Sequence, residues 1–261
     1  MLNNKNSFKV SVIMNCRNGD KFLKKSINSI ISQTYENWEL IFFDNSSTDK
    51  SVEVVKNFSD KRIKIFKSKK FLKLYDARNL AISKAKGDFI SFCDTDDWWK
   101  KIKLEKQIKV AVKNRSNFVF SNLLIFDNKT KNTKLYFRKK YPNGKITQEL
   151  LNDYKVGILT VLMRKKLFKK KKFNKKFNII GDFDFFLRLS LEQEFHCIQE
   201  PLAYYRHHEN NYSKNTNIYL KEMRQWYNVN KSKFKRLKYS LKRFEFWLYK
   251  LKLKNFIKSG L

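Results

Sequence analysis

Short apolar runs alternate with segments of helical periodicity over the first hundred residues of the chain. Apolar side chains recur at three- and four-residue steps between Phe22 and Ile31, which predicts a helix there. Further helices are predicted at 47–58 and 76–86, and strands at 8–14, 38–43, 62–66 and 88–93. This alternation is typical of a mostly parallel sheet with helices packed on both faces.

The alternation weakens beyond residue 100. The pattern there predicts helices at 102–113 and from Gly181, and strands at 118–126, 134–137, 158–163 and 202–205. From about Tyr219 the chain is predicted to be helical, with one apolar stripe among many Lys and Arg residues. We therefore expect an α/β domain over residues 1–215 and a basic amphipathic helical extension over residues 216–261.

The composition is typical of a folded protein, and its charge creates a strong positive electrostatic field. A chain of 261 residues suits one large domain, and a hydrophobic content of 42% with 16% aromatic residues argues against disorder. The formal net charge of +34 attracts nucleic acid, anionic lipid and phosphorylated small molecules without choosing among them.

Cysteine usage and hydropathy indicate the compartment. Cys16, Cys93 and Cys197 lie far apart and are expected to be reduced, buried thiols, because no paired-cysteine spacing is present. The apolar start at 10–14 is too short for a signal peptide, and no run approaches the ~20 residues of a spanning helix. We expect a cytoplasmic protein that can touch the cytoplasmic face of a membrane without crossing it.

Polar residues cluster where three predicted strands end, at 15–18, 44–49 and 94–97. In open α/β sheets, ligands gather outside the carboxyl ends of the strands, where the strand order reverses. Asp94 and Asp96, two positions apart, can converge on one Mg²⁺ or Mn²⁺ that bridges them to a diphosphate. The alternative is an acidic loop that caps the next helix at Asp97.

Four runs, in this order and spacing, resemble the family 2 glycosyltransferases. They are SVIMNCRN at 11–18, SQTY at 32–35, ELIFFDNSSTD at 39–49 and GDFISFCDTDDW at 87–98. The resemblance implies the GT-A fold, a Rossmann-like mixed sheet with helices on both faces, in which residues 8–100 bind the nucleotide and residues 101–215 the acceptor. It also implies a nucleotide-diphosphate sugar donor, usually a UDP-sugar, a divalent metal, and inversion at the anomeric carbon.

The resemblance assigns roles residue by residue. Asp44 matches the position that binds the base, and Arg78 one beside the nucleotide, while Asp94 faces the ribose or metal and Asp96 binds the metal. The other residues expected at the nucleotide-sugar are Cys16, Arg17, Asn18, Asn45 and Thr95. Arg17 stands where the family often has a stacking ring, a task that a guanidinium can also perform. Asn45 replaces a common second Asp.

Two motifs of the second half complete the resemblance. Residues 181–189 are similar to the family's acidic motif, in which Asp182 aligns with the catalytic base and Gly181 replaces a usual Glu. The alternative for Asp182 is a helix N-cap. Asp184 is expected in packing or hydrogen bonding, because residues two apart do not share a helix face. Residues 205–213 resemble the closing motif, in which His208 reaches the metal or diphosphate.

The expected activity is transfer of a sugar to a glycan or lipid-linked acceptor in cell-surface polysaccharide or glycolipid synthesis. A nucleotidyltransferase of related fold is one alternative, but it would carry a Gly-rich loop after the first strand, and residues 15–20 hold one Gly. A basic nucleic-acid-binding protein is the other, and it leaves the carboxylates at the strand ends unexplained. No specific nucleic-acid partner is therefore expected.

The basic extension carries its own prediction. Its stripe consists of Phe234, Leu237, Leu241, Phe244, Leu248 and Leu251, with Lys and Arg on either side. Such a helix is typical of the interface plane of an anionic membrane, where a lipid-linked acceptor would be found. The alternative is that the stripe packs on the catalytic domain or on a second subunit in a homodimer.

Overall fold

The computed structural model describes residues 8–209, 211 and 214–258, with side chains as far as residue 254. The strands are β1 (Val10–Cys16), β2 (Trp38–Asp44), β3 (Ile63–Lys67), β4 (Phe89–Phe92), β5 (Trp98–Trp99), β6 (Phe118–Asp127), β7 (Thr133–Leu135), β8 (Leu162–Arg164) and β9 (Phe195–His207). They form one mixed sheet in the order β3-β2-β1-β4-β8-β6-β9-β5, and β7 pairs with β6.

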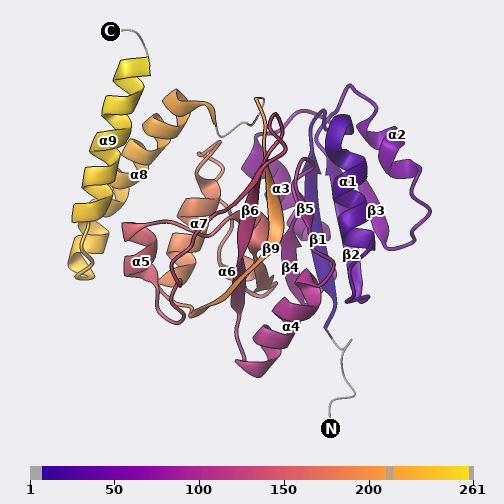
Figure 1. The fold of residues 1–261 in the computed structure, drawn as a ribbon, viewed down its shortest axis with the longest axis horizontal. Coiled ribbons are helices and arrows are strands. Elements are labelled where there is room, and N and C mark those ends of the chain that lie inside the picture. The colour runs from indigo at the N-terminus through magenta and orange to yellow at the C-terminus, as the bar shows by residue number, and fades with distance from the viewer. Residues whose placement is uncertain (1–7, 210, 212–213, 259–261) are drawn as a thin grey trace.

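Helices lie between and after these strands (Figure 1). They are α1 (Asp20–Ile31), α2 (Ser51–Lys56), α3 (Leu74–Lys84), α4 (Lys103–Lys113), α5 (Thr147–Asn152), α6 (Leu167–Lys170), α7 (Gly181–Ser190), α8 (Thr216–Arg236) and α9 (Lys242–Lys258), with a 3₁₀ turn, η1, at Ile158–Thr160. In the part of the chain that the structure describes, no helix is both long and apolar enough to cross a membrane.

The predicted parallel core is confirmed. Strand β1 lies between β2 and β4 and runs parallel to both, and β3 continues the parallel set beyond β2. The strand order therefore reverses between β1 and β4. Because Cys16 pairs with Asp44 in register, the segments that follow β1 and β2 leave the same edge of the sheet.

Helices cover both faces of the sheet, as predicted. Val10, Val12 and Met14 of β1 pack in the core cluster that includes apolar residues of α1 and α4, whereas Ile13 packs in the cluster that includes residues of α3 and α7. Successive side chains of a strand point to opposite faces. Apolar side chains of β1 are therefore buried on both faces of the sheet, and the buried Ser11 among them donates a hydrogen bond to Glu39.

The second half of the sheet reverses direction. Strand β8 runs antiparallel to both β4 and β6, while β9 runs parallel to β6 and then antiparallel to β5. Register shifts on either side of Asn122 bend the β6–β9 pair. Through the pairing of Trp98 with Tyr204, the end of β9 lies beside the acidic residues 94–97.

Several predicted elements differ in extent from those observed. The predicted strand at 158–163 divides into η1 and β8, and the predicted strand at 202–205 is the end of the longer β9. The short elements β5, α5 and α6 are not predicted by the periodicity of the sequence.

The C-terminal extension is helical, as predicted, and its two helices form a hairpin. Helix α8 ends at Arg236, Lys238 adopts a φ of 61°, and α9 begins at Lys242. Figure 1 shows the two helices side by side at one end of the molecule, with α9 outermost. The turn brings Phe234 and Phe244 against Trp226, at ring-centroid distances of 5.6 and 5.5 Å.

Most of the predicted apolar stripe packs on protein. Phe234, Leu241 and Phe244 are buried and Leu248 packs against the same core cluster, whereas Leu237 is 45% exposed in the turn. The prediction that this stripe faces a membrane is therefore wrong, and its alternative, packing on the catalytic domain, holds. The boundary at residue 215 stays a prediction.

Candidate active site

A cavity of about 540 Å³ opens at the carboxyl ends of β1 and β4. Six of the residues predicted from the sequence line it: Arg17, Arg78, Asp94, Thr95, Asp96 and Asp182. The last of these comes from α7, far along the chain, so the fold brings the two predicted acidic motifs to one cavity. Apolar and tyrosine side chains from the second half of the chain form the remaining wall, among them Leu123, Ile125, Tyr136, Tyr154, Val156, Ile158 and Tyr205.

The loops after β1 and β2 interlock. The Asn18 side-chain oxygen accepts a hydrogen bond from the Thr48 backbone N–H at 2.8 Å, and the Arg17 guanidinium donates to the carbonyls of Asn45 and Ser46. Both Asn18 (φ 53°) and Ser46 (φ 59°) adopt left-handed backbone conformations, which Asn tolerates better than most residues. Arg17 remains exposed beside the cavity, with its guanidinium 4.9 Å from the Phe71 ring centroid.

Five residues of the predicted site do not line this cavity: Cys16, Asn18, Asp44, Asn45 and His208. Cys16 is buried in the core, and burial raises the pKa of its thiol. The Asn45 side chain is bonded through both its oxygen and its nitrogen to the backbone of Leu72. Asp44 is buried and accepts the Ser47 backbone N–H at 3.3 Å. In this structure the side chains of Asn18, Asp44 and Asn45 make hydrogen bonds that hold the loops after β1 and β2.

The carboxylates after β4 have different partners. Arg78, buried on α3, donates to Asp94 Oδ1 at 2.9 Å. Burial raises the pKa of Asp94, and the Arg78 charge opposes that rise. Asp96 Oδ2 lies 2.9 Å from His208 Nε2, and Asn211 donates to the same oxygen at 3.3 Å. Asn210, Tyr212 and Ser213 of the predicted closing motif lie outside the described residues.

Arg206 joins the acidic loop to the end of β9, a role that the sequence did not predict. Its backbone N–H donates to Asp97 Oδ1 at 2.9 Å, and its Nε donates to the Asp96 carbonyl at 2.8 Å. The guanidinium also stacks over Phe22 and Trp98, at 4.3 and 4.6 Å from the ring centroids. Arg206 stands in the run that carries the resemblance, and that was its one signal in the sequence.

Asp182 lies across the cavity from the acidic loop. Burial raises its pKa to about 6, although the Phe183 backbone N–H donates to Oδ1 at 2.8 Å and the Arg78 charge also favours ionisation. The Tyr75 hydroxyl donates to the Ile179 carbonyl at 2.7 Å and accepts from the Asp182 backbone N–H at 3.2 Å. A carboxyl with this pKa is ionised at neutral pH and still basic enough to take a proton.

The packing explains why Gly181 precedes Asp182. A Cβ built at residue 181 would overlap the ring of Tyr75, which is itself fully buried. The usual Glu of the family at this position is therefore excluded by Tyr75. Asp184 has the structural role expected of it, since it accepts from Trp226 Nε1 at 3.2 Å and from Arg188 Nε at 2.9 Å.

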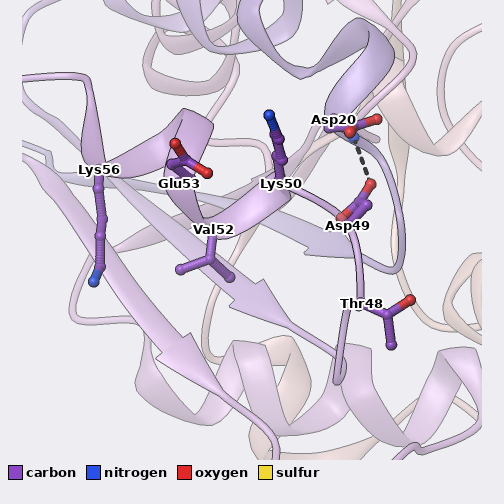
Figure 2. A pocket seen from close by; sticks show the side chains of 7 residues that line it. All are labelled: Asp20, Thr48, Asp49, Lys50, Val52, Glu53 and Lys56. Atoms are coloured by element: carbon purple, nitrogen blue, oxygen red, sulfur yellow. Dashed lines mark hydrogen bonds between the residues drawn. The ribbon is translucent and has the colours of Figure 1, made fainter.

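A second hollow, of about 660 Å³, lies between the start of α1 and α2 (Figure 2). Asp49 accepts the Asp20 backbone N–H at 3.1 Å there, as the dashed line marks, and Lys50, Glu53 and Lys56 come from α2 and the turn before it. None of the predicted catalytic, donor-binding or metal-binding residues lines this hollow, which is open to solvent. The candidate site is therefore the cavity at the strand ends.

The donor set at the acidic loop fits a hard divalent cation. Asp96 and His208 already converge within 2.9 Å, and carboxylate oxygens such as those of Asp94 and Asp96 are the ligands that suit Mg²⁺ and Mn²⁺. Among the described residues no group of three or more such side chains is preassembled. Mg²⁺ in nucleotide enzymes is commonly held by one or two carboxylates together with substrate phosphates, so two protein ligands are sufficient.

A sheet that switches order between β1 and β4, with an acidic loop at the switch and a second carboxylate across the cavity, defines a transferase of the GT-A fold class. The model of the glycosyl transferase family 2 matches residues 11–195, and the chain belongs to this family. Family membership decides against the two alternatives considered from the sequence.

Relatives and solved structures agree with this assignment. The chain is 37% identical over 158 residues to the Escherichia coli UDP-Glc:alpha-D-GlcNAc-diphosphoundecaprenol beta-1,3-glucosyltransferase WfgD, covering 60% of this chain and 61% of the relative. It is 32% identical over 203 residues to a glycosyltransferase of Methanocaldococcus jannaschii, covering 76% and 70%. The match therefore spans about three fifths of WfgD.

The fold matches that of Staphylococcus aureus TarS residues 1–349, crystallised in complex with UDP-GlcNAc. The TM-score is 0.70 at 19% sequence identity, over 83% of this chain and 65% of TarS 1–349. At this identity the likeness establishes the fold, and the roles of individual residues depend on the geometry of this chain.

Proposed function

We propose that the protein transfers a sugar from a UDP-sugar to a hydroxyl of a glycan carried on a lipid, with inversion, in the synthesis of a cell-surface polysaccharide or glycolipid. One observation carries the proposal: a single cavity is lined by the acidic loop and Arg78 on one side and by Asp182 on the other. WfgD, a UDP-Glc transferase, and the TarS complex with UDP-GlcNAc support UDP as the nucleotide, and WfgD supports a lipid-diphosphate saccharide as the acceptor.

Asp182 is the general base in this proposal. Its carboxylate takes the proton of the acceptor hydroxyl as that oxygen attacks the anomeric carbon of the donor. The bond from that carbon to the diphosphate oxygen breaks, and the diphosphate leaves with the electron pair. Attack from the face opposite the leaving group inverts the anomeric configuration. No covalent enzyme intermediate is needed, because the acceptor itself is the nucleophile.

Asp96 and His208, with Asp94 beside them, would hold the divalent cation. A bound Mg²⁺ or Mn²⁺ supplies positive charge that stabilises the departing diphosphate. Arg78 orients Asp94 through their 2.9 Å ion pair, and Arg206 holds the backbone of Asp96. Arg17, exposed at the cavity, is positioned to stack on the base or to contact the diphosphate.

The outward side of α9 supports contact with an anionic membrane surface. Phe246, Tyr249 and Leu253 are 59%, 58% and 43% exposed and, at spacings of three and four residues, share one helix face. We call these three residues the outer α9 face. Lysine and arginine residues surround it: Lys242, Arg243, Lys250, Lys252 and Lys254. Exposed apolar side chains among lysines are typical of helices that lie in a lipid interface.

A panel of nucleotide-sugars, assayed with and without Mn²⁺ or Mg²⁺, tests the proposed activity. UDP-sugars are expected to raise the melting temperature only when metal is present, and one of them to release UDP slowly in water and rapidly with lipid-diphosphate saccharides. Separation of the product anomers by NMR then reports inversion. If no nucleotide-sugar stabilises or reacts while the protein shifts DNA in a salt-dependent manner, the proposal is wrong.

A further inference from the structure

Glu222 of α8 reaches the segment that immediately precedes the base-bearing helix α7. It is 4% exposed, and its carboxylate accepts four hydrogen bonds from residues 178–180. The donors are Asn178 N at 2.6 Å, Asn178 Nδ2 at 3.0 Å, Ile179 N at 2.9 Å and Ile180 N at 3.2 Å. Three consecutive backbone N–H groups thus converge on one buried carboxylate, a charge-assisted arrangement that is stronger than neutral hydrogen bonds.

The same segment is held from its other side by Tyr75. The Tyr75 hydroxyl donates to the Ile179 carbonyl, so Ile179 is bonded through its N–H to α8 and through its C=O to α3. Asp182 follows three residues later and is itself bonded to Tyr75 through its backbone N–H. The backbone that leads to Asp182 is thus bonded to two partners from different helices, Glu222 of α8 and Tyr75 of α3.

Further contacts tie the hairpin to α7. Trp226, one turn after Glu222, donates to Asp184 and packs edge-on against the Phe183 ring at 4.9 Å, and Phe244 of α9 stacks on the same ring at 6.0 Å. These contacts act on the body of α7, whereas Glu222 acts on the turn that precedes it. Glu222 also lies beyond residues 11–195, the segment that matches the family model.

We propose that Glu222 is a positioning residue for catalysis: the C-terminal hairpin, through this carboxylate, fixes the turn 178–180 and so sets the base Asp182 against the acceptor hydroxyl. The inference rests on the proposed role of Asp182. Asn178 and Ile179 also line the cavity, so the same clamp shapes the wall next to the base. The extension thus completes the catalytic site in addition to covering apolar surface.

Glu222→Gln tests the inference, because glutamine keeps the size but turns one acceptor oxygen into an N–H₂ donor that faces backbone N–H groups. We expect turnover per active site to fall by about 10- to 100-fold with donor Kd within twofold, since small displacements of a catalytic group have effects of this size. Active sites are counted by calorimetric titration with UDP and Mn²⁺. Glu222→Asp, which keeps the charge on a shorter side chain, should recover part of the lost turnover.

Glu245→Gln is the matched control, being the same change in the same hairpin at a carboxylate whose bond goes to Tyr227. It should leave turnover within twofold. Hydrogen exchange of peptides spanning 176–184 should accelerate in Glu222→Gln and not in Glu245→Gln. Normal turnover per active site in Glu222→Gln, or lost turnover matched by lost donor binding, overturns the inference. Asp182→Asn distinguishes a failure of this inference from a failure of the proposed function. If that variant is fully active, Asp182 is not the base.

Discussion

The two sides of the cavity are built in different ways. The donor side is made by loops that leave neighbouring parallel strands, and the register of β1 and β2 sets the contacts between the first two loops, as in the bond from the Asn45 backbone N–H to the Cys16 carbonyl at 2.8 Å. The base side is made by helix α7, which Tyr75 of α3 and the Glu222 clamp of α8 hold through contacts that no strand register sets. Tyr75 and Asp182 are 107 residues apart, and Glu222 lies 44 residues from Asn178.

A sequence motif therefore carries different information on the two sides of the cavity. On the donor side, strand periodicity alone predicts that three polar clusters meet at one edge of the sheet. On the base side, the motif predicts that an acid stands at residue 182. The packing of distant helices, which the motif does not show, raises the pKa of the Asp182 carboxyl and orients its side chain. Substitutions should therefore affect donor binding on one side and turnover on the other.

Asp96→Ala should have the largest effect, because it removes a proposed cation ligand from the donor side. We expect transfer to fall below detection and the metal-dependent part of donor binding to disappear, while the melting temperature changes little. Asp88→Ala, the same change at the opposite end of β4, is the control and should retain both properties. Donor titration with and without Mn²⁺ measures the difference. If Asp96→Ala is fully active at saturating metal, Asp96 does not bind the catalytic cation.

Asp182→Asn should affect turnover alone. Asparagine keeps the shape and can still accept from the Phe183 backbone N–H, but it cannot take a proton. Turnover should fall by about 10²- to 10⁴-fold, the range for loss of a general base, with donor Kd within twofold. Asp184→Asn, two positions further along α7, should lower stability but leave turnover within a few-fold. Lost donor binding with normal turnover of bound donor would make Asp182 structural.

The pH dependence of turnover should report Asp182. Its raised pKa of about 6 means that the carboxylate becomes protonated, and thus inactive, as the pH falls below 6. The logarithm of turnover should then fall by about one per pH unit on the acid side. Titration of UDP binding with Mn²⁺ over the same pH range separates this limb from protonation at Asp94. An acid limb near pH 4 would contradict the raised pKa of Asp182.

The parallel half of the fold could be predicted from the sequence because its period is regular. Strands β1 to β4 each have enough residues to set a pattern, whereas β5 has two, and the turn at Lys238 interrupts a helix pattern that continues on either side. No local signal marks that turn. The position of such a turn depends on tertiary packing, which overrides local helix propensity.

The sequence predicted which residues lie at part of the candidate site, but not how their side chains are oriented. Asp94, Asp96 and Asp182 line one cavity, as expected from the motifs, and their catalytic and metal-binding roles stay predictions. Asn45 stands in the motif, yet its amide is bonded to Leu72. Tyr75 and Glu222 carry no motif, since their importance comes only from hydrogen bonds to residues that are distant in sequence.

The smallest effect on turnover is expected at the outer α9 face, which contacts neither side of the cavity. Replacing Phe246, Tyr249 and Leu253 by Ser should change stability by about 0.5 kcal/mol or less per site, as is usual for exposed positions. Turnover with a water-soluble acceptor should be unchanged, because Glu222 and Trp226 on α8 still hold the base-bearing segment. Sedimentation with anionic vesicles, and turnover of a lipid-linked acceptor in them, should both decrease.

Val112→Ser, an equally exposed apolar position on α4 at 48%, is the control and should bind vesicles like the unchanged protein. High salt should release the unchanged protein from anionic vesicles, since screening weakens the attraction of its lysines to lipid headgroups. Binding that survives both the triple substitution and high salt would place the lipid contact elsewhere on the basic surface. A triple variant that loses turnover with the soluble acceptor would instead extend the base side of the site to the outer surface of α9, because the hairpin would then transmit its packing to Asp182.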